Sequence, residues 1–181
     1  MGLFSIFKNN KKEEKIKEAQ DFVSSTEQNG GLRPVQTSIL LKKDEKAFFS
    51  EEKVPLKEVR MVSKRSGGGM GVRLFKGVYV GGGQSESRSL PELRDIDSGA
   101  LILTNKRLVF DGMIENKSLD LDKMLSIEIY TDGLEISFEG KSKSSFFMVK
   151  NPYLWKLVLS LVKGVPDPEK IKKGSLNIKF E

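Results

Sequence analysis

Two short apolar runs, joined by a two-residue polar turn, constrain the fold of this chain more than any other feature. The runs are residues 100–104 and 107–110, and Asn105 and Lys106 lie between them. Asparagine tolerates the positive φ angle that the tightest hairpin turns require. The sequence therefore predicts a β-hairpin here, and a hairpin needs further strands or a helix against its apolar face to be stable.

Several other segments have the composition of short antiparallel strands. A second hairpin is predicted at residues 126–138, with its turn at residues 131–133. Its alternation is strict: Ile127, Ile129, Leu134, Ile136 and Phe138 should face a core, and Glu128, Glu135 and Ser137 should face water. Further strands are predicted at residues 46–49, 59–63, 72–80, 146–149 and, as an edge strand, 175–180. Residues 54–60 could instead form a short helical turn, and glycine clusters bracket the strand at 72–80.

Two helices are predicted on either side of this β-rich region. Asn151 and Pro152 supply an N-cap and a first-turn proline for an amphipathic helix that ends at Gly164. Residues 10–28 favour a second helix, whose thin apolar stripe predicts light packing or a solvated helix. We interpret the charged run at 11–15 as solvated surface.

These elements predict a mainly β fold with α (α+β). We expect a bent antiparallel sheet or barrel of about seven strands, plugged by the C-terminal amphipathic helix. The predicted organisation is an N-terminal extension with a helix at residues 1–34, a domain at 35–164 and a C-terminal tail at 165–181.

Three segments carry a resemblance to a known family. Residues 99–110 read Gly-Ala-Leu-Ile-Leu-Thr-Asn-Lys-Arg-Leu-Val-Phe, residues 119–124 read Leu-Asp-Leu-Asp-Lys-Met, and Trp155 lies in the final helix. Over residues 45–163 the chain resembles the bacterial and archaeal PH-like (GRAM-like) domains of the pleckstrin-homology superfold. The resemblance implies a binding module, although this fold hosts many unrelated functions. The glycine-rich insert at 66–89 and the N-terminal helix depart from the family's simplest form.

Composition excludes several kinds of catalytic site. The chain has no histidine and no cysteine, which excludes Cys/His zinc sites, histidine-dependent nucleophiles and disulfides. The glycine clusters match neither a P-loop nor a dinucleotide-binding motif. Asp95 with Asp97, or Asp120 with Asp122, could share a metal ion, but such pairs are usually solvated. We expect a protein that is not an enzyme and needs no cofactor or metal, and we rank a carboxylate-based or Mg²⁺-dependent enzyme lowest.

Charge is distributed unevenly along the chain. Residues 64–90 hold five basic residues and one acid, residues 141–163 hold five basic residues and no acid, and residues 91–140 hold eleven acids and five basic residues. Because PH-like folds gather loops at one open end, the resemblance implies one basic rim, made of Lys64, Arg65, Arg73, Lys76, Arg88, Lys141 and Lys143. At about 1 kcal/mol per basic residue, such a rim would bind an anionic membrane weakly and in a salt-dependent manner.

The N-terminus adds an apolar element to this predicted membrane contact. Leu3, Phe4, Ile6 and Phe7 precede the first lysines and could enter a headgroup region as an interfacial anchor. Apolar stretches elsewhere fall short of the about 20 residues that span a bilayer, and no signal peptide is recognisable. We therefore expect a cytoplasmic protein, peripheral at the inner face of the membrane.

Three kinds of partner stay open at this point. The favoured partner is an anionic lipid surface or a protein. Nucleic acid is an alternative through residues 64–88, but only Phe75 and Tyr79 in that segment are aromatic residues that could stack on bases. A peptide is a further alternative, added as a strand in the groove that PH-like folds form between a strand edge and the final helix.

Overall fold

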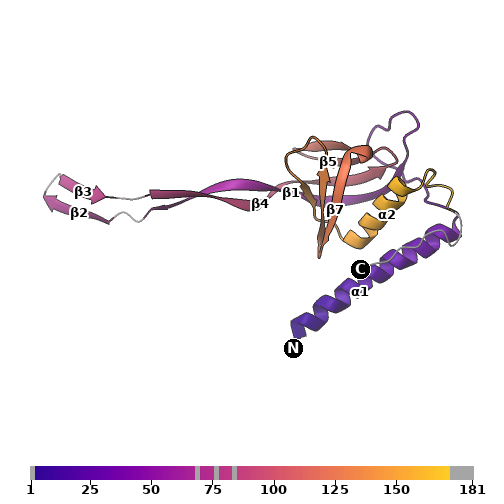
Figure 1. The fold of residues 1–181 in the computed structure, drawn as a ribbon, viewed down its shortest axis with the longest axis horizontal. Helices are drawn as coiled ribbons and strands as arrows, with labels where there is room; N and C mark the ends of the chain where they lie inside the picture. The colour runs from indigo at the N-terminus through magenta and orange to yellow at the C-terminus, as the bar shows by residue number, and fades with distance from the viewer. Residues whose placement is uncertain (1–2, 68–69, 76–77, 83–84, 172–181) are drawn as a thin grey trace. The chain divides into compact units, whose positions relative to one another are not determined.

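The computed structural model of this chain describes residues 3–67, 70–75, 78–82 and 85–171, with side chains for residues 10–61 and 92–171. The chain divides into two compact units (Figure 1). One is made of residues 1–58 and 95–181, and the other of residues 59–94.

The first unit is built on a curled antiparallel sheet. Within the described residues, seven strands lie in the order β6-β5-β4-β1-β9-β8-β7. Their bounds are β1 (Ala47–Gly67), β4 (Ser85–Thr104), β5 (Arg107–Gly112), β6 (Asn116–Asp120), β7 (Met124–Tyr130), β8 (Gly133–Phe138) and β9 (Ser145–Phe147). A 3₁₀ turn at Leu121–Lys123 separates β6 from β7. This half-barrel, followed by helix α2 (Pro152–Gly164), is the mainly β fold that the sequence predicts, and it is consistent with the PH-like superfold.

The two predicted hairpins are confirmed. In the first, β4 pairs with β5 from Gly99–Gly112 to Leu103–Leu108. In the second, β7 pairs with β8 and the turn closes at Tyr130–Gly133. Leu134 and Ile136 are buried as their alternation predicts, because one face of β8 lies against the core.

The strands predicted at residues 46–49 and 59–63 are confirmed apart from residue 46, but both belong to one longer strand. They are not separated by a break, and residues 54–60 do not form a helical turn, because β1 runs continuously through the region. Leu56 and Lys57 pair with β9, and the carbonyl of Pro55 accepts a hydrogen bond from Met148 N–H at 2.9 Å. Proline has no N–H group to donate, so only its carbonyl can take part in backbone pairing at this position.

The second unit contains the remaining parts of β1 and β4 and a separate hairpin. Strands β2 (Met70–Phe75) and β3 (Val78–Gly82) pair antiparallel, with Phe75 opposite Val78. The prediction of a single strand at 72–80 was therefore wrong. Two residues, Lys76 and Gly77, connect the two strands in the sequence, and a two-residue link containing glycine is a hairpin signal that the strand interpretation overlooked.

Helix α2 closes the core of the first unit, as the sequence predicts. The Asn151 side chain caps it by accepting the Leu154 N–H at 3.1 Å. The largest buried side chains come from three different elements: Trp155 from α2, Phe110 from β5 and Phe147 from β9. Among the described residues, no helix combines the length and apolarity needed to cross a bilayer.

Helix α1 (Leu3–Gln28) starts earlier than predicted and packs on α2 through one narrow stripe. Ala19 is fully buried, and the Phe22 ring meets the edge of Phe49, which in turn meets Trp155 with ring centres 4.8 Å apart. Helix α1 therefore packs lightly on the domain, which is one of the two outcomes that its thin apolar stripe predicts.

The chain after α2 returns to the end of α1. Leu32 N–H donates to the carbonyl of Pro168 at 2.7 Å, and the N–H of buried Ile171 donates to Gly30 at 2.7 Å. Gly31 lies so close to the segment after α2 that a Cβ atom at Gly31 would come within 2.3 Å of the Glu169 carbonyl. The edge strand predicted at 175–180 lies outside the described residues.

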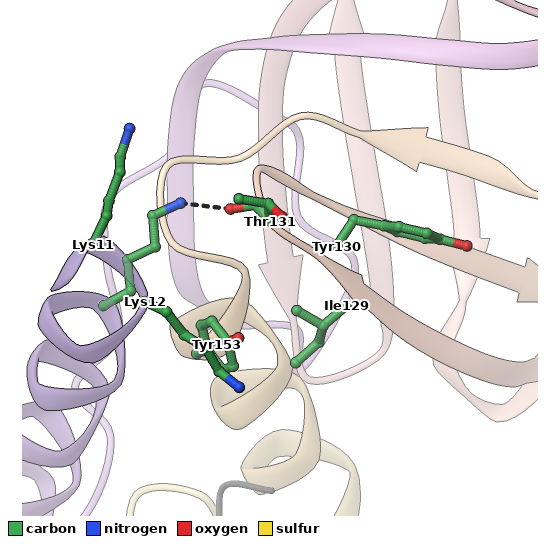
Figure 2. Close-up of a pocket in the computed structure, with 7 residues that line it drawn as sticks. Lys11, Lys12, Ile129, Tyr130, Thr131 and Tyr153 are labelled. Carbon is green, nitrogen blue, oxygen red and sulfur yellow. Dashed lines mark hydrogen bonds between the residues drawn. The ribbon is translucent and has the colours of Figure 1, made fainter. Parts of the chain in front are cut away.

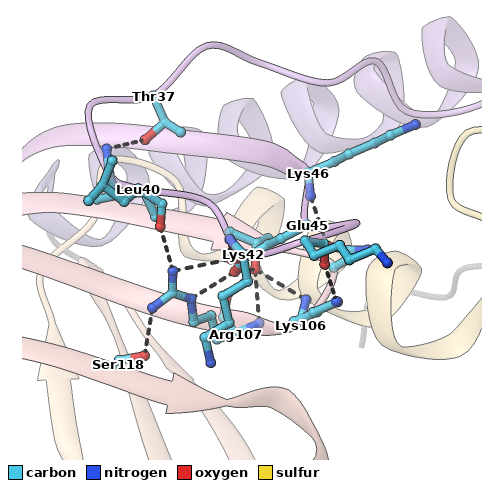
Figure 3. Close-up of polar contacts among 12 residues, drawn as sticks. Thr37, Leu40, Lys42, Glu45, Lys46, Lys106, Arg107 and Ser118 are labelled. Atoms are coloured by element: carbon cyan, nitrogen blue, oxygen red, sulfur yellow. Dashed lines mark hydrogen bonds and ion pairs between the residues drawn. The ribbon is translucent and has the colours of Figure 1, made fainter.

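A buried ion pair between Glu45 and Arg107, together with Thr104, joins the β4–β5 turn to the loop before β1 (Figure 3). We call these three residues the polar clamp. The Glu45 carboxylate is fully buried and accepts Arg107 Nε–H at 2.7 Å, Thr104 Oγ1–H at 2.7 Å and Lys42 N–H at 2.6 Å. Arg107 also donates to the Leu40 carbonyl at 2.9 Å. Burial alone would raise the pKa of Glu45, but the hydrogen bonds from Arg107, Lys42 and Thr104 outweigh it and hold the pKa at about 2. Glu45 is therefore ionised at neutral pH.

Candidate anion-binding site

A pocket of about 430 Å³ opens between α1, the β7–β8 turn and the start of α2 (Figure 2). We call it the lysine pocket, and its lining residues are Lys11, Lys12, Lys15, Ile129, Tyr130, Thr131 and Tyr153. Three lysines and two tyrosines thus line one space, and none of the described residues that line it is a carboxylate. The Tyr130 hydroxyl points away from the lysines (Figure 2) and donates to the Glu135 carboxylate at 2.8 Å. Such a lining is suited to an anion.

Lys15 is the innermost of the three lysines. Its side chain is half-buried, and its ammonium donates to the Thr131 carbonyl at 2.9 Å. Burial lowers the pKa of Lys15, and the charge of Lys11 lowers it further, although Asp132, Glu18 and Glu51 act in the opposite direction. Burial and the Lys11 charge both disfavour the ammonium form of Lys15. A bound anion would favour that form, so it would raise the pKa of Lys15 again.

Asn151 fixes the turn of α1 that carries Lys15. Besides capping α2, its Nδ2 group donates to the Lys15 carbonyl at 2.9 Å and to the Glu18 carboxylate at 2.8 Å. Asn151 is itself buried, so these bonds are shielded from competing water. One side chain therefore sets the start of α2 and the position of α1 together.

We expect Asn151→Ala to lower the free energy of unfolding by about 1–2 kcal/mol, because the cap of α2 is lost. The amides of residues 15–18 should exchange faster with deuterium, because α1 loses two contacts. Urea unfolding followed by circular dichroism, together with hydrogen exchange, measures both effects.

Two further variants separate the roles of Asn151. Asn151→Asp keeps an acceptor for the Leu154 N–H but places a carboxylate against Glu18, so it should loosen α1 while preserving the start of α2. Ser160→Ala, at an exposed position of the same helix, is the matched control and should change neither measurement. Unchanged exchange in α1 for both Asn151 variants would contradict the coupling.

The structure describes the side chains of two of the predicted rim residues. Lys141 and Lys143 are exposed in the β8–β9 turn, where they line a hollow of about 230 Å³ with Lys117. The other five side chains lie outside the described part of the chain: Lys64, Arg65, Arg73, Lys76 and Arg88. Their convergence with Lys141 and Lys143 stays a prediction.

The predicted membrane anchor also stays a prediction. Leu3, Phe4, Ile6 and Phe7 belong to α1, but their side chains are outside the described set. Sequence reasoning missed the lysine pocket because mixed charges at 11–15 are typical of solvated helix surface. The available signal was the spacing of Lys11 and Lys15, which places both on one helix face.

The acidic pairs considered as metal ligands have other roles or are solvated. Asp95 forms an ion pair with Lys57 at 3.1 Å, and Asp97 binds backbone N–H groups. Asp120 and Asp122 are exposed. Within the described residues, no three acidic groups gather as a metal site would require.

Comparisons identify no relative: no protein-family model, curated protein or solved structure matches this chain. The lysine pocket therefore has to be interpreted from its own chemistry.

Proposed function

We propose that this protein is a non-enzymatic, PH-like module that binds an anionic membrane surface through the lysine pocket. The observation that carries the proposal is that Lys11, Lys12 and Lys15 line one open space, in which no described lining residue is a carboxylate. A lipid phosphate in this space would accept charge-assisted hydrogen bonds from the lysine ammonium groups.

The order of residues along α1 supports a membrane rather than a free anion. Four apolar residues at positions 3–7 precede Lys11 in the same helix. Three lysines near an anionic bilayer contribute about 1 kcal/mol each, which alone gives weak binding. Stable attachment usually requires a second signal, and a short apolar segment beside basic residues can supply it.

Strand addition is a second candidate because β7 is the last strand of the sheet. Within the described residues it pairs with β8 alone. Lysine ammonium groups bind backbone carbonyls near both of its ends: Lys163 at Met124 (3.0 Å) and Lys15 at Thr131 (2.9 Å). A peptide could pair only between these two lysines. Nucleic-acid binding through residues 64–88 stays a prediction, because the side chains of that segment lie outside the described set.

Co-sedimentation with phosphatidylcholine vesicles, with and without phosphatidylserine, tests the proposal. The wild-type protein should bind only the anionic vesicles, and its affinity should fall with added salt. Lys11→Glu/Lys12→Glu should weaken binding at least about tenfold, because two attractive contributions of about 1 kcal/mol become repulsive. Lys15 is kept in this variant because it also supports the β7–β8 turn.

Lys141→Glu/Lys143→Glu is the matched control, with the same change in net charge at a different turn. If this pair abolishes vesicle binding and the α1 pair does not, the binding surface is the predicted rim and the lysine pocket is excluded. If the wild type binds neither vesicle but shifts DNA or RNA in a gel, the nucleic-acid alternative replaces the proposal. A Phe4→Ser/Phe7→Ser variant reports separately on the predicted anchor.

A further inference from the structure

Two adjacent apolar side chains are presented to solvent at the turn between β5 and β6. Met113 is 94% exposed and Ile114 is 78% exposed. We call these two residues the β5–β6 tip. Single exposed apolar residues need no explanation, but two neighbours at one turn form a contact surface whose burial would be favourable.

The tip is held in place by hydrogen bonds. The Asp97 carboxylate accepts the N–H groups of Ile114 at 2.7 Å and Glu115 at 2.8 Å. These backbone bonds hold the pKa of Asp97 below its usual value. Gly112 N–H bonds back to the Glu115 carbonyl at 3.2 Å and closes the turn. A surface that is already ordered loses little conformational entropy when a partner binds.

A hollow of about 400 Å³ lies directly beside Met113. It is lined by residues of the loop before β1, of β1 itself and of the β4–β5 hairpin, and the charged ones are Glu52, Lys53 and Asp111. Glu52 and Asp111 are exposed, and neither has an ion-pair partner among the described residues. Lys53 is the single cation among the described lining residues.

We infer that the β5–β6 tip and this hollow form a docking site for a basic polypeptide segment that also carries apolar side chains. The apolar side chains pack on Met113 and Ile114, and lysine or arginine groups of the partner pair with Glu52 and Asp111. The charge around the tip favours a cationic partner over an anionic membrane. Asp97 and Glu115 add negative charge there, which attracts a cationic segment and repels an anionic membrane. The site uses none of the lysine-pocket residues and goes beyond the proposed function.

The test uses the full chain and two synthetic amphipathic peptides, one of lysine and leucine and one of glutamate and leucine in the same order. Fluorescence anisotropy of the labelled peptides gives the affinities. The lysine peptide should bind the wild type, and the glutamate peptide should not. Met113→Ser/Ile114→Ser and, separately, Glu52→Gln/Asp111→Asn should each weaken lysine-peptide binding by about tenfold or more, because each removes one half of the site.

Leu125→Ser is the matched control, since Leu125 is 68% exposed in β7 and outside the site. It should bind the lysine peptide as the wild type does, and circular dichroism should show all variants folded. Equal binding of both peptides, or unchanged binding by the tip variant, overturns the inference. So does a dimer that the tip variant abolishes in light scattering, because the occupant is then a second copy. Vesicle binding should be unchanged in the tip variant, and its loss there would overturn the assignment to a polypeptide.

Discussion

Replacing Arg107 with methionine should lower the free energy of unfolding by about 3–5 kcal/mol, because the substitution leaves a buried carboxylate without its cation. The Glu45 side chain has no exposed surface, and Arg107 is the only cation whose hydrogen bonds to it are described. Thr104 and the Lys42 N–H would still donate to Glu45, but neither carries a charge. Urea unfolding monitored by circular dichroism measures the change.

A double variant distinguishes a broken ion pair from a general defect in packing. Glu45→Met/Arg107→Met removes both charges, so it should recover most of the stability that Arg107→Met loses. Lys123→Met, at an exposed position, is the control for loss of a positive charge and should be nearly neutral. If the double variant is no more stable than Arg107→Met, the cost does not come from the unpaired carboxylate.

The polar clamp should also make the free energy of unfolding of the wild type depend on pH in the acidic range. The folded-state pKa of Glu45 is about 2, below its ordinary value of 4.5, so its contribution to stability is fully present above about pH 4.5. That contribution, about 3 kcal/mol in all, is lost as the pH falls toward 2. The double variant should lack this component, which ties the acid response to Glu45.

The sequence predicts those parts of the fold that depend on neighbouring residues. Alternation identified both hairpins around Asn105 and Asp132, and the Asn151-Pro152 pair identified the start of α2. The motif around Arg107 could be recognised, but its structural role could not, because Glu45 lies 62 positions earlier in the chain. Continuity of β1 was missed for the same reason: its pairing with β9 joins distant segments.

The candidate site depends even more on distant contacts. Lys15 meets Thr131 across 116 positions, and Asn151 reaches Glu18 across 133. The local charge pattern of α1 is typical of a solvated helix, and the pocket that three of its lysines line exists only because α1 packs on the rest of the unit. The β5–β6 tip is different, since Met113 and Ile114 are adjacent in sequence. What the sequence could not show is that Asp97 fixes their turn and that a hollow lies beside it.

Trp155 supports the Phe49 ring on which Phe22 of α1 packs, and Trp155→Ala should therefore affect both stability and binding. The indole is 1% exposed, meets the Phe49 ring edge at 4.8 Å between centres and donates from Nε1 to Glu51 at 2.8 Å. Truncation of a buried tryptophan lowers the free energy of unfolding by about 3–5 kcal/mol, because contacts are lost and a cavity is left behind. Urea unfolding followed by circular dichroism gives the value, since tryptophan fluorescence is lost with the only tryptophan of the chain.

Trp155→Phe keeps an aromatic ring beside Phe49 but loses the hydrogen bond to Glu51, whose carboxylate keeps the Lys150 N–H as a partner. This variant should lower the free energy of unfolding by less, about 1–3 kcal/mol, and should leave α1 docked. Lys156→Ala, on the exposed face of α2, is the neutral control. Because Phe22 of α1 packs on Phe49 and Phe49 packs on Trp155, a folded Trp155→Ala protein should show faster hydrogen exchange in α1. Its binding to anionic vesicles should weaken in parallel. Full vesicle binding by a folded Trp155→Ala protein with an undocked α1 would mean that the lysines act as a loose basic segment, and that the pocket itself contributes nothing.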